Sequence, residues 1–197
     1  MNPQLWWYLS RATAIVAYLF LTASVLWGVA LASGAFAPQR RPWLLDLHRW
    51  LGGLTLAALA GHLIALVGDS SVEFTPAELL IPLASDWRPW AVALGVIALW
   101  TLLAIQLTSL ARRRLPRRAW RAVHLLSYAV FWLVSLHGAL AGTDSSRPAY
   151  VTTAALVVGL VAVALCYRIV TRGRRQHRRD MPTREPRADA DLAAGAS

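Results

Sequence analysis

The sequence predicts an all-α fold, an integral membrane bundle of five transmembrane helices. Three observations lead to this prediction: 57% of the 197 residues are hydrophobic, five apolar segments are long, and the charge of the loops between them alternates. Such a composition is too apolar for an ordinary soluble domain. A helix needs about 20 mostly apolar residues to cross a bilayer. The five expected spans are Ala12–Ala32, Trp43–Gly68, Pro89–Ala111, Ala119–Ala141 and Ala149–Val170.

The first span has some features of a signal peptide, because it is followed by the small-residue stretch ASGAFA. However, the preceding segment MNPQLWWYLS contains no positively charged side chain. The apolar run is also longer than the roughly 7–15 residues of a signal-peptide core. We therefore expect this segment to be a membrane span.

The loop charges predict the orientation of the bundle. The loop between spans three and four, RRRLPRRAWR, contains six arginines and no acid. The loop between spans two and three carries Asp69, Glu73, Glu78 and Asp86 against Arg88 alone. Cytoplasmic loops are enriched in basic residues. The N-terminus is therefore expected outside and the C-terminus in the cytoplasm, which agrees with an odd number of spans.

The formal net charge of +10 could indicate a nucleic-acid partner. Because the arginines flank apolar runs, we instead expect the lipid bilayer of the plasma membrane as the partner, and no nucleic acid. Residues 1–171 are expected to form the transmembrane domain. Residues 172–197 are rich in Arg, Pro and Asp and are expected to be a disordered cytoplasmic tail, whose basic cluster contacts anionic lipid.

Two smaller features complete the outline. Cys166 is the single cysteine, which excludes an intramolecular disulfide and any CxxC motif. The stretch VEFTPAELLIPLAS is apolar but interrupted by Pro76 and Pro82. We expect it to be a short interfacial segment over the outer face of the bundle.

Four histidines lie inside the predicted spans. His48 and His62 are 14 positions apart in span two, and His124 and His137 are 13 positions apart in span four. Both spans are expected to run from inside to outside, so His48 and His124 share an inner level while His62 and His137 share an outer level. At 1.5 Å per residue, the levels are about 20 Å apart. Two pairs of imidazoles across the helices are therefore expected.

Three interpretations of these histidines compete. Each histidine could bond to a hydroxyl or carbonyl of a neighbouring helix, but four intramembrane histidines at matched depths favour a functional site. Free metal ions usually add carboxylate or thiolate ligands, and no acid lies between Leu47 and Gly68 or between Ala119 and Gly142. The third interpretation is a b-type heme on each pair of axial imidazoles. Small residues would then make room for a flat macrocycle, or only allow close helix packing: Gly52, Gly53, Gly61 and Gly138.

The two spacings are not equivalent on a helix. Fourteen residues are about 3.9 turns, which places His48 and His62 on nearly one face. Thirteen residues are about 3.6 turns and leave His124 and His137 roughly 140° apart on a straight helix. Either span four is locally distorted or the two sites are offset sideways.

Three stretches resemble the ferric reductase/NADPH oxidase transmembrane superfamily: DLHRWLGGLTLAALAGHLIAL, LLIPLASDWRPWAVALGVIALWTLLAIQLTSLARR and RRAWRAVHLLSYAVFWLVSLHG. The resemblance covers about Leu9 to Ala141. It is strongest to short bacterial ferric reductase-like transmembrane proteins and more distant to the heme-binding membrane subunit of the methionine sulfoxide reductase system. It implies that the four histidines ligate the iron of two b hemes, which pass electrons across the membrane. The chain would be the heme-bearing component of an oxidoreductase.

The chain departs from this family in two ways. The family core usually has six spans, and one N-terminal span is missing here. The flavin- and nicotinamide-binding domains of the eukaryotic members are also missing, and there is no GxGxxG motif. We therefore expect a separate flavin/nicotinamide reductase as donor and an external electron acceptor. A non-redox transporter that uses the histidines as a metal or proton path remains the alternative.

Three arginines are further candidates for holding heme propionates. Arg11 lies at the outer end of span one, where it could pair with an outer propionate or extend to the interface. Arg49 and Arg121 flank the inner histidines, where they could hold inner propionates or act only as the positive-inside signal. Tyr128, Phe131 and Trp132 lie between the two levels and are expected to be aromatic packing or to shape the path between hemes.

Overall fold

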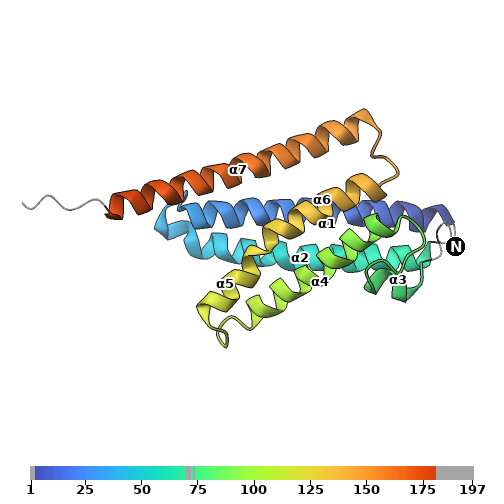
Figure 1. The fold of residues 1–197 in the computed structure, drawn as a ribbon, viewed down its shortest axis with the longest axis horizontal. Helices are drawn as coiled ribbons and strands as arrows, with labels where there is room; N and C mark the ends of the chain where they lie inside the picture. Colours follow the sequence, from blue (N-terminus) through green and yellow to red (C-terminus); the bar gives the residue numbers. More distant parts are fainter. Residues whose placement is uncertain (1–2, 70–71, 73, 181–197) are drawn as a thin grey trace, which may run out of the picture.

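The computed structural model describes residues 3–69, 72 and 74–180, and it contains only helices and loops there. Its elements, shown in Figure 1, are α1 (Pro3–Ser33), the 3-10 helix η1 (Pro38–Arg40), α2 (Arg41–Gly68), α3 (Pro76–Leu80), α4 (Pro89–Leu110), α5 (Arg117–Leu125), α6 (Ser127–Ala141) and α7 (Pro148–Asp180).

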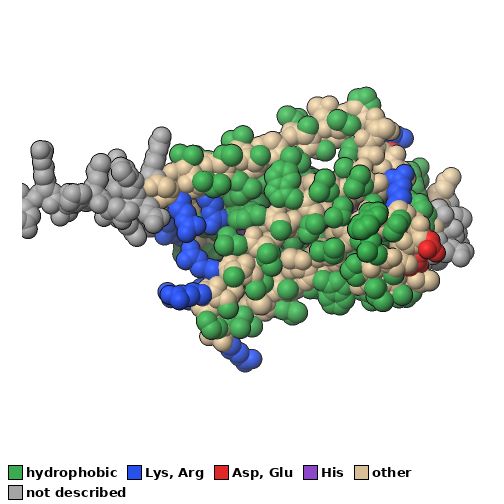
Figure 2. Space-filling model, viewed as in Figure 1, with side chains coloured by type: hydrophobic (Ala, Val, Ile, Leu, Met, Phe, Trp, Pro, Cys, Tyr) green, Lys and Arg blue, Asp and Glu red, His purple; other side chains and the backbone are tan. Residues whose placement is uncertain are grey.

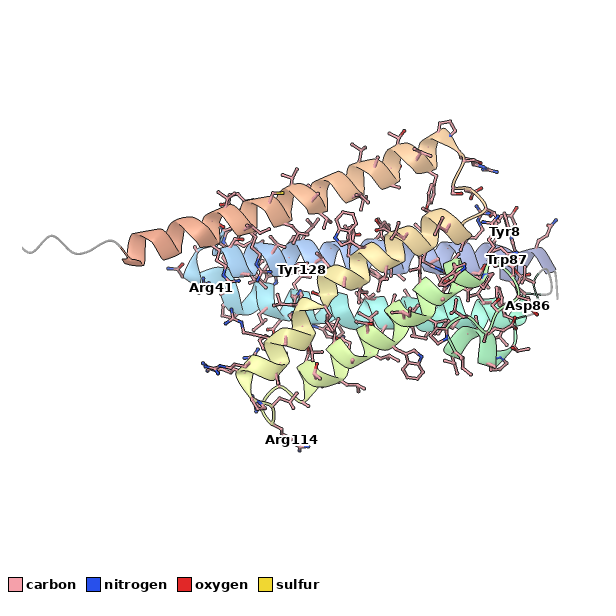
Figure 3. All side chains as sticks on the ribbon, in the orientation of Figure 1. Tyr8, Arg41, Asp86, Trp87, Arg114 and Tyr128 are labelled. Carbon is pink, nitrogen blue, oxygen red and sulfur yellow. The ribbon has the colours of Figure 1, made fainter. Side chains whose placement is uncertain are left out.

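The five predicted spans are confirmed as helices long and apolar enough to cross a membrane: α1, α2, α4, the α5–α6 pair and α7. The face of the bundle shown in Figure 2 is largely apolar along its length, and its charged side chains lie at the two ends. We call these the basic end, marked by Arg41 and Arg114, and the acidic end, marked by Tyr8, Trp87 and Asp86 (Figure 3). Apolar sides between charged ends suit a bilayer. Which end faces the cytoplasm stays a prediction.

α1 is the helix that joins α2, α6 and α7. α1 and α2 form the most extensive pairing, α4 packs on α6, and α1 also contacts α6 and α7. The core contains Val130 and Phe131 of α6 and Val161 of α7, which have no exposed surface. These residues lie midway along the bundle, so the two levels of histidines are separated by packed apolar side chains.

Local signals at helix ends fix the connections. α1 ends at Ser33. The next residue, Gly34, has a φ of 64° that turns the chain, and the Ala35 N–H then bonds to the Ala30 carbonyl at 3.2 Å. α4 begins after Arg88, which is left-handed with φ 47°. The Arg88 side chain donates to the carbonyl of Leu140, in the last turn of α6. A cation at a helix C-terminus is favourable, and this contact joins α4 to the end of α6.

The fourth span is distorted, one of the two outcomes that its spacing predicted. The break is at Leu126, between α5 and α6, directly after His124. The Leu126 N–H bonds to the carbonyl of Val123, three residues back, at 3.0 Å. A 3-10 turn advances about 120° per residue against about 100° in an α-helix. The tighter winding therefore reduces the angle of roughly 140° that a straight helix would leave between the two histidines.

Two further segments of the structure relate to the expected outline of the chain. α7 continues as a helix to Asp180, past the domain boundary expected at residue 171, and residues 181–197 of the expected tail lie outside the described residues. Arg and Gln are good helix formers, so a polar composition does not end a helix that is already nucleated. The proline-interrupted segment forms α3, whose N-terminus is capped by Thr75 and Glu78.

Candidate functional site

The structure brings the four histidines together in the two predicted pairs. The basic-end pair consists of His48 on α2 and His124 on α5, with ring centres 5.9 Å apart and ring planes at 76°. The acidic-end pair consists of His62 on α2 and His137 on α6, which lie close enough for their charges to interact. All four side chains are half-buried. Each level therefore presents one imidazole from α2 to one from the fourth span.

Both rings of the acidic-end pair are oriented by backbone carbonyls. His62 Nδ1–H donates to the Ser10 carbonyl of α1 at 2.8 Å, and His137 Nδ1–H donates to the Ala91 carbonyl of α4 at 2.7 Å. A carbonyl oxygen only accepts, so the proton must be on Nδ1 and the lone pair on Nε2. Histidines that ligate metals are held in this way, with the second nitrogen bonded to a carbonyl or carboxylate.

The basic-end pair is held less completely. His48 Nδ1–H donates to the Ser24 carbonyl at 3.0 Å, and the Ser24 hydroxyl lies 3.3 Å from the same nitrogen. His124 Nδ1 is buried and has no hydrogen-bond partner among the described residues. Its ring instead stacks on Trp120, with centres 5.1 Å apart and planes at 22°. Three of the four histidines thus have a fixed tautomer, and the fourth is positioned by an aromatic neighbour.

Two glycines that the sequence analysis did not select lie directly against histidine rings. A Cβ atom on Gly95 of α4 would lie 2.8 Å from His137 Cε1, and one on Gly28 of α1 would lie 3.4 Å from His48 Cε1. Both glycines belong to helices other than those of the histidines they face. Residue spacing along one helix does not predict a contact with another helix. The only hint in the sequence is that a glycine occurs within an apolar span.

The four glycines expected to make room for a macrocycle have other neighbours. Gly52 faces Gln106, Gly61 faces Thr13, and Gly138 faces the Tyr150 hydroxyl. A Cβ on Gly53 would meet no atom within 4 Å. Three of the four therefore lie at helix contacts rather than against the imidazoles, as small residues commonly do in membrane bundles.

The predicted arginines do not lie on the histidine rings. Arg11 forms an ion pair with Asp144 and donates to Thr143 Oγ1 at 2.7 Å, so its charge is already matched. Arg49 pairs with Asp46 at 2.9 Å on the exposed surface, and Arg121 is exposed. Their predicted roles toward heme propionates stay predictions.

Two other arginines lie near the basic-end pair. Arg168 is on α7, and Arg112 follows the end of α4. The Arg168 guanidinium lies 5.3 Å above the Tyr128 ring centre, and that of Arg112 lies 5.2 Å from the Trp120 ring centre. The sequence analysis missed them because they come from segments distant in the chain from His124.

The pairs suit a metal that brings its own in-plane ligands. Within residues 3–69, 72 and 74–180, no three His, Cys, Asp or Glu side chains converge on one point. Imidazole nitrogens are common ligands of transition metals. The two rings of the basic-end pair, with centres 5.9 Å apart, are close enough that both could hold one such metal. The fixed Nδ1 tautomers and the glycine contacts also fit a bis-histidine heme.

The fold and these pairs define a multi-pass helical membrane protein with facing imidazoles at two depths. Residues 13–136 match the family model described as ferric reductase like transmembrane component. The match covers more than half of the chain, and the chain belongs to this family, whose members generally bind heme. The match includes His48, His62 and His124 and ends one residue before His137. Comparison of the chain with curated proteins and with solved structures gave no match.

Proposed function

We propose that this chain is a b-type cytochrome of the plasma membrane. It would carry electrons through two bis-histidine hemes, from a separate cytoplasmic flavin/nicotinamide reductase to an external acceptor. The observation that carries the proposal is the pairing of imidazoles at two depths, with Nδ1 of His48, His62 and His137 bonded to carbonyls. This bonding leaves Nε2 of each ring available as a metal ligand.

Heme on two axial imidazoles supplies a one-electron carrier whose potential depends on its ligands and surroundings. The chain's own residues would do three things. α2 and the fourth span hold the axial ligands, and the carbonyls of Ser10, Ser24 and Ala91 fix three of the rings. Val130 and Phe131 have no exposed surface and exclude water between the levels. Helix geometry separates the levels by about 20 Å, so each pair serves one half of the membrane.

The direction of transfer follows from the loop charges. The positive-inside rule assigns the basic end to the cytoplasm. The basic-end pair would then receive electrons and the acidic-end pair would release them. In a variant with Cys166→Ser as background, a cysteine at Asp86 should react with an impermeant reagent added outside cells, and one at Arg114 should not. The opposite labelling pattern would reverse the proposed direction.

The direct test of function is the heme content of the purified protein. We expect an absorption spectrum of low-spin b heme and two hemes per chain. A nicotinamide cofactor alone should not reduce them at a useful rate, while reduced flavin should. A preparation that binds no heme would exclude the cytochrome and favour the alternative, a transporter with a histidine path. A single five-coordinate heme would also contradict the proposal.

A further inference from the structure

An ion pair at the acidic end joins two segments that are distant in the chain. Arg11 of α1 pairs with Asp144, which lies in the loop between α6 and α7. This loop and the N-terminal part of α1 lie at the same end of the bundle (Figure 1). The Arg11 guanidinium also donates to Thr143 Oγ1 at 2.7 Å and lies 4.1 Å from the centre of the Trp7 ring. Two contacts of the Arg11 side chain are therefore made with the α6–α7 loop, and a third fixes it against its own helix.

The two charges of this ion pair are largely shielded from solvent. The exposed fractions of the Arg11 and Asp144 side chains are 24% and 29%. Asp144 also pairs with Arg147 at 3.0 Å, but the Arg147 side chain is 75% exposed and only three residues away. An exposed local pair contributes little to stability, whereas removing one partner of a shielded pair leaves an uncompensated charge. The pair with Arg11 is therefore the one that constrains the fold.

Both sides of this ion pair are connected to the acidic-end histidines. Ser10, the neighbour of Arg11, provides the carbonyl that accepts from His62 Nδ1–H at 2.8 Å. His137 belongs to α6, and Asp144 follows it seven residues later in the loop. The ion pair thus joins the helix that orients His62 to the helix that carries His137.

A second contact between α1 and α6 lies on the other side of His137. The hydroxyl groups of Tyr18 on α1 and Ser135 on α6 are 3.0 Å apart. Ser135 is two residues before His137, and Asp144 is seven residues after it. His137 is therefore held between two contacts to α1, and the outer contact is the ion pair.

We propose that Arg11 and Asp144 are positioning residues for the acidic-end heme ligands. Their ion pair holds α1 and the end of α6 at the separation at which His62 and His137 both face one metal. The proposal rests on the proposed function, because it assigns the ion pair a role in heme ligation. It does not use Arg11 as a partner of a heme propionate, since Asp144 matches its charge.

The first experiment opens the ion pair in the heme-loaded protein. Asp144→Asn removes the charge, and the control Arg147→Gln removes only the exposed partner of the same carboxylate. Carbon monoxide binds ferrous heme where an axial ligand has left the iron, so its absorption change reports lost ligation. In a His48→Ala background, which should keep the acidic-end heme, Asp144→Asn should raise the fraction that binds carbon monoxide about tenfold. Arg147→Gln should match its parent, and neither change should affect the basic-end heme of a His62→Ala background.

A reversed pair distinguishes the ion pair from the loss of either residue alone. Arg11→Asp and Asp144→Arg should each increase carbon monoxide binding, and their combination should restore part of the original ligation. The comparison is made with Arg147→Gln present throughout, so that no third charge faces the reversed pair. A general loss of folding would not be repaired by the combination.

The second experiment does not need heme. Diethyl pyrocarbonate modifies unprotonated imidazole nitrogens, and mass spectrometry of the full-length apoprotein gives the rate at each histidine. Asp144→Asn should speed the modification of His62 and His137 about tenfold, because a hydrogen-bonded charge pair no longer holds the two helices. The rates at His48 and His124 should not change.

The proposal is overturned if Asp144→Asn and Arg147→Gln give the same carbon monoxide binding and the same modification rates. Equal changes at both ends of the bundle also overturn it, because the ion pair would then act on the whole fold. A wild-type protein that binds no heme contradicts the proposed function alone. The modification rates of the apoprotein then decide whether the ion pair positions His62 and His137.

Discussion

The two histidine pairs use the same residue types but differ in how the protein holds them. At the acidic end, His62 and His137 both donate to backbone carbonyls, of α1 and α4. At the basic end, only His48 has such a bond, and His124 depends on stacking with Trp120. The comparison shows that the presence of a histidine does not by itself fix the orientation of its ring. An imidazole whose Nδ1–H bonds to a carbonyl is held in one orientation, and an imidazole without this bond can adapt its orientation.

The difference follows from the path of the fourth span. α6 lies along α4, so a carbonyl of α4 reaches His137. α5 is separated from α6 by the break at Leu126, and His124 lies in the last turn of this short helix. The break reduces the angle between the two histidines, and His124 Nδ1 has no hydrogen-bond partner among the described residues. The basic-end pair is therefore the one expected to respond more to its surroundings.

The largest expected effect is the loss of one heme when one histidine is removed. His62→Ala or His137→Ala should remove the acidic-end heme and leave the other, and His48→Ala or His124→Ala should do the reverse. A gap of about 20 Å along the helix axis then remains, which is too long for fast electron transfer. The measurement is heme content and spectrum of each purified variant.

The same variants test the direction in vesicles with reductant inside. Variants of the acidic-end pair should reduce their remaining heme but not an external acceptor, and variants of the basic-end pair should reduce neither. If His48→Ala and His62→Ala remove the same heme, pairing of the histidines by depth is wrong. The two ends of the bundle would then not hold separate hemes that can be compared.

Glycine-to-alanine variants compare the space at the two pairs. Gly95→Ala would place Cβ 2.8 Å from His137 Cε1, and this ring cannot move away without losing its bond to Ala91. Overpacking of this kind costs about 1–3 kcal/mol, so heme affinity at the acidic end should fall about tenfold or more. Gly28→Ala, at 3.4 Å from His48, should have a much smaller effect at the basic end.

Gly53→Ala is the matched control, because its Cβ meets nothing within 4 Å. Heme affinity is measured by titrating heme into apoprotein of all three variants. Equal affinities for Gly95→Ala and Gly53→Ala would show that His137 is not confined as the structure describes.

A smaller effect is expected from removing the aromatic support of His124. Trp120→Leu should weaken heme binding at the basic end by a few-fold, because an aromatic pair contributes about 0.5–1.5 kcal/mol. The acidic-end heme should not change. Trp50→Leu is the control, since Trp50 is 71% exposed on the apolar surface of α2. The two heme spectra and their midpoint potentials are measured together, and equal changes at both ends would contradict the assigned role of Trp120.

Features of single helices could be predicted from the sequence. The five spans and the depths of the four histidines follow from apolar length and residue spacing, which also require either a distortion of span four or a sideways offset of its two histidines. The structure confirms the spans and brings His48 to His124. These predictions succeed because they depend on periodicity within a segment or on a difference in residue number.

Contacts between helices could not be predicted in the same way. Gly28 and Gly95 face histidines of other helices, and Arg168 of α7 lies over the Tyr128 ring of α6. Such contacts depend on the rotation and crossing of helices, which a single sequence does not specify. For the same reason, the sequence does not predict the ion pair between Arg11 of α1 and Asp144 of the loop before α7.

The smallest expected effect concerns pH at the acidic end, where α3 is joined to α4 by the bond from Trp100 Nε1 to the Leu80 carbonyl at 2.8 Å. Glu78 is exposed and caps α3. The backbone N–H and the hydroxyl of Thr75 both donate to its carboxylate and hold its pKa below the ordinary value of 4.5. Because the pKa of Glu78 is lowered, its ionised carboxylate stabilises the cap at pH values above about 4.5. This stabilisation is lost as the pH falls below about 4.5 toward the lowered pKa. Hydrogen-exchange protection of the α3 amides should therefore decrease in this acidic range.

Glu78→Gln is the matched variant, because its amide oxygen accepts the same bonds and does not titrate. Its α3 protection should be lower than that of the wild type at neutral pH and independent of pH in the acidic range. The heme spectrum of the basic-end pair should not change with this substitution, since α3 lies at the opposite end of the bundle (Figure 1). If the α3 amides of wild type and Glu78→Gln lose protection in parallel as the pH falls, a group other than Glu78 causes the pH dependence. The stabilisation of α3 by the ionised Glu78 carboxylate would then be wrong.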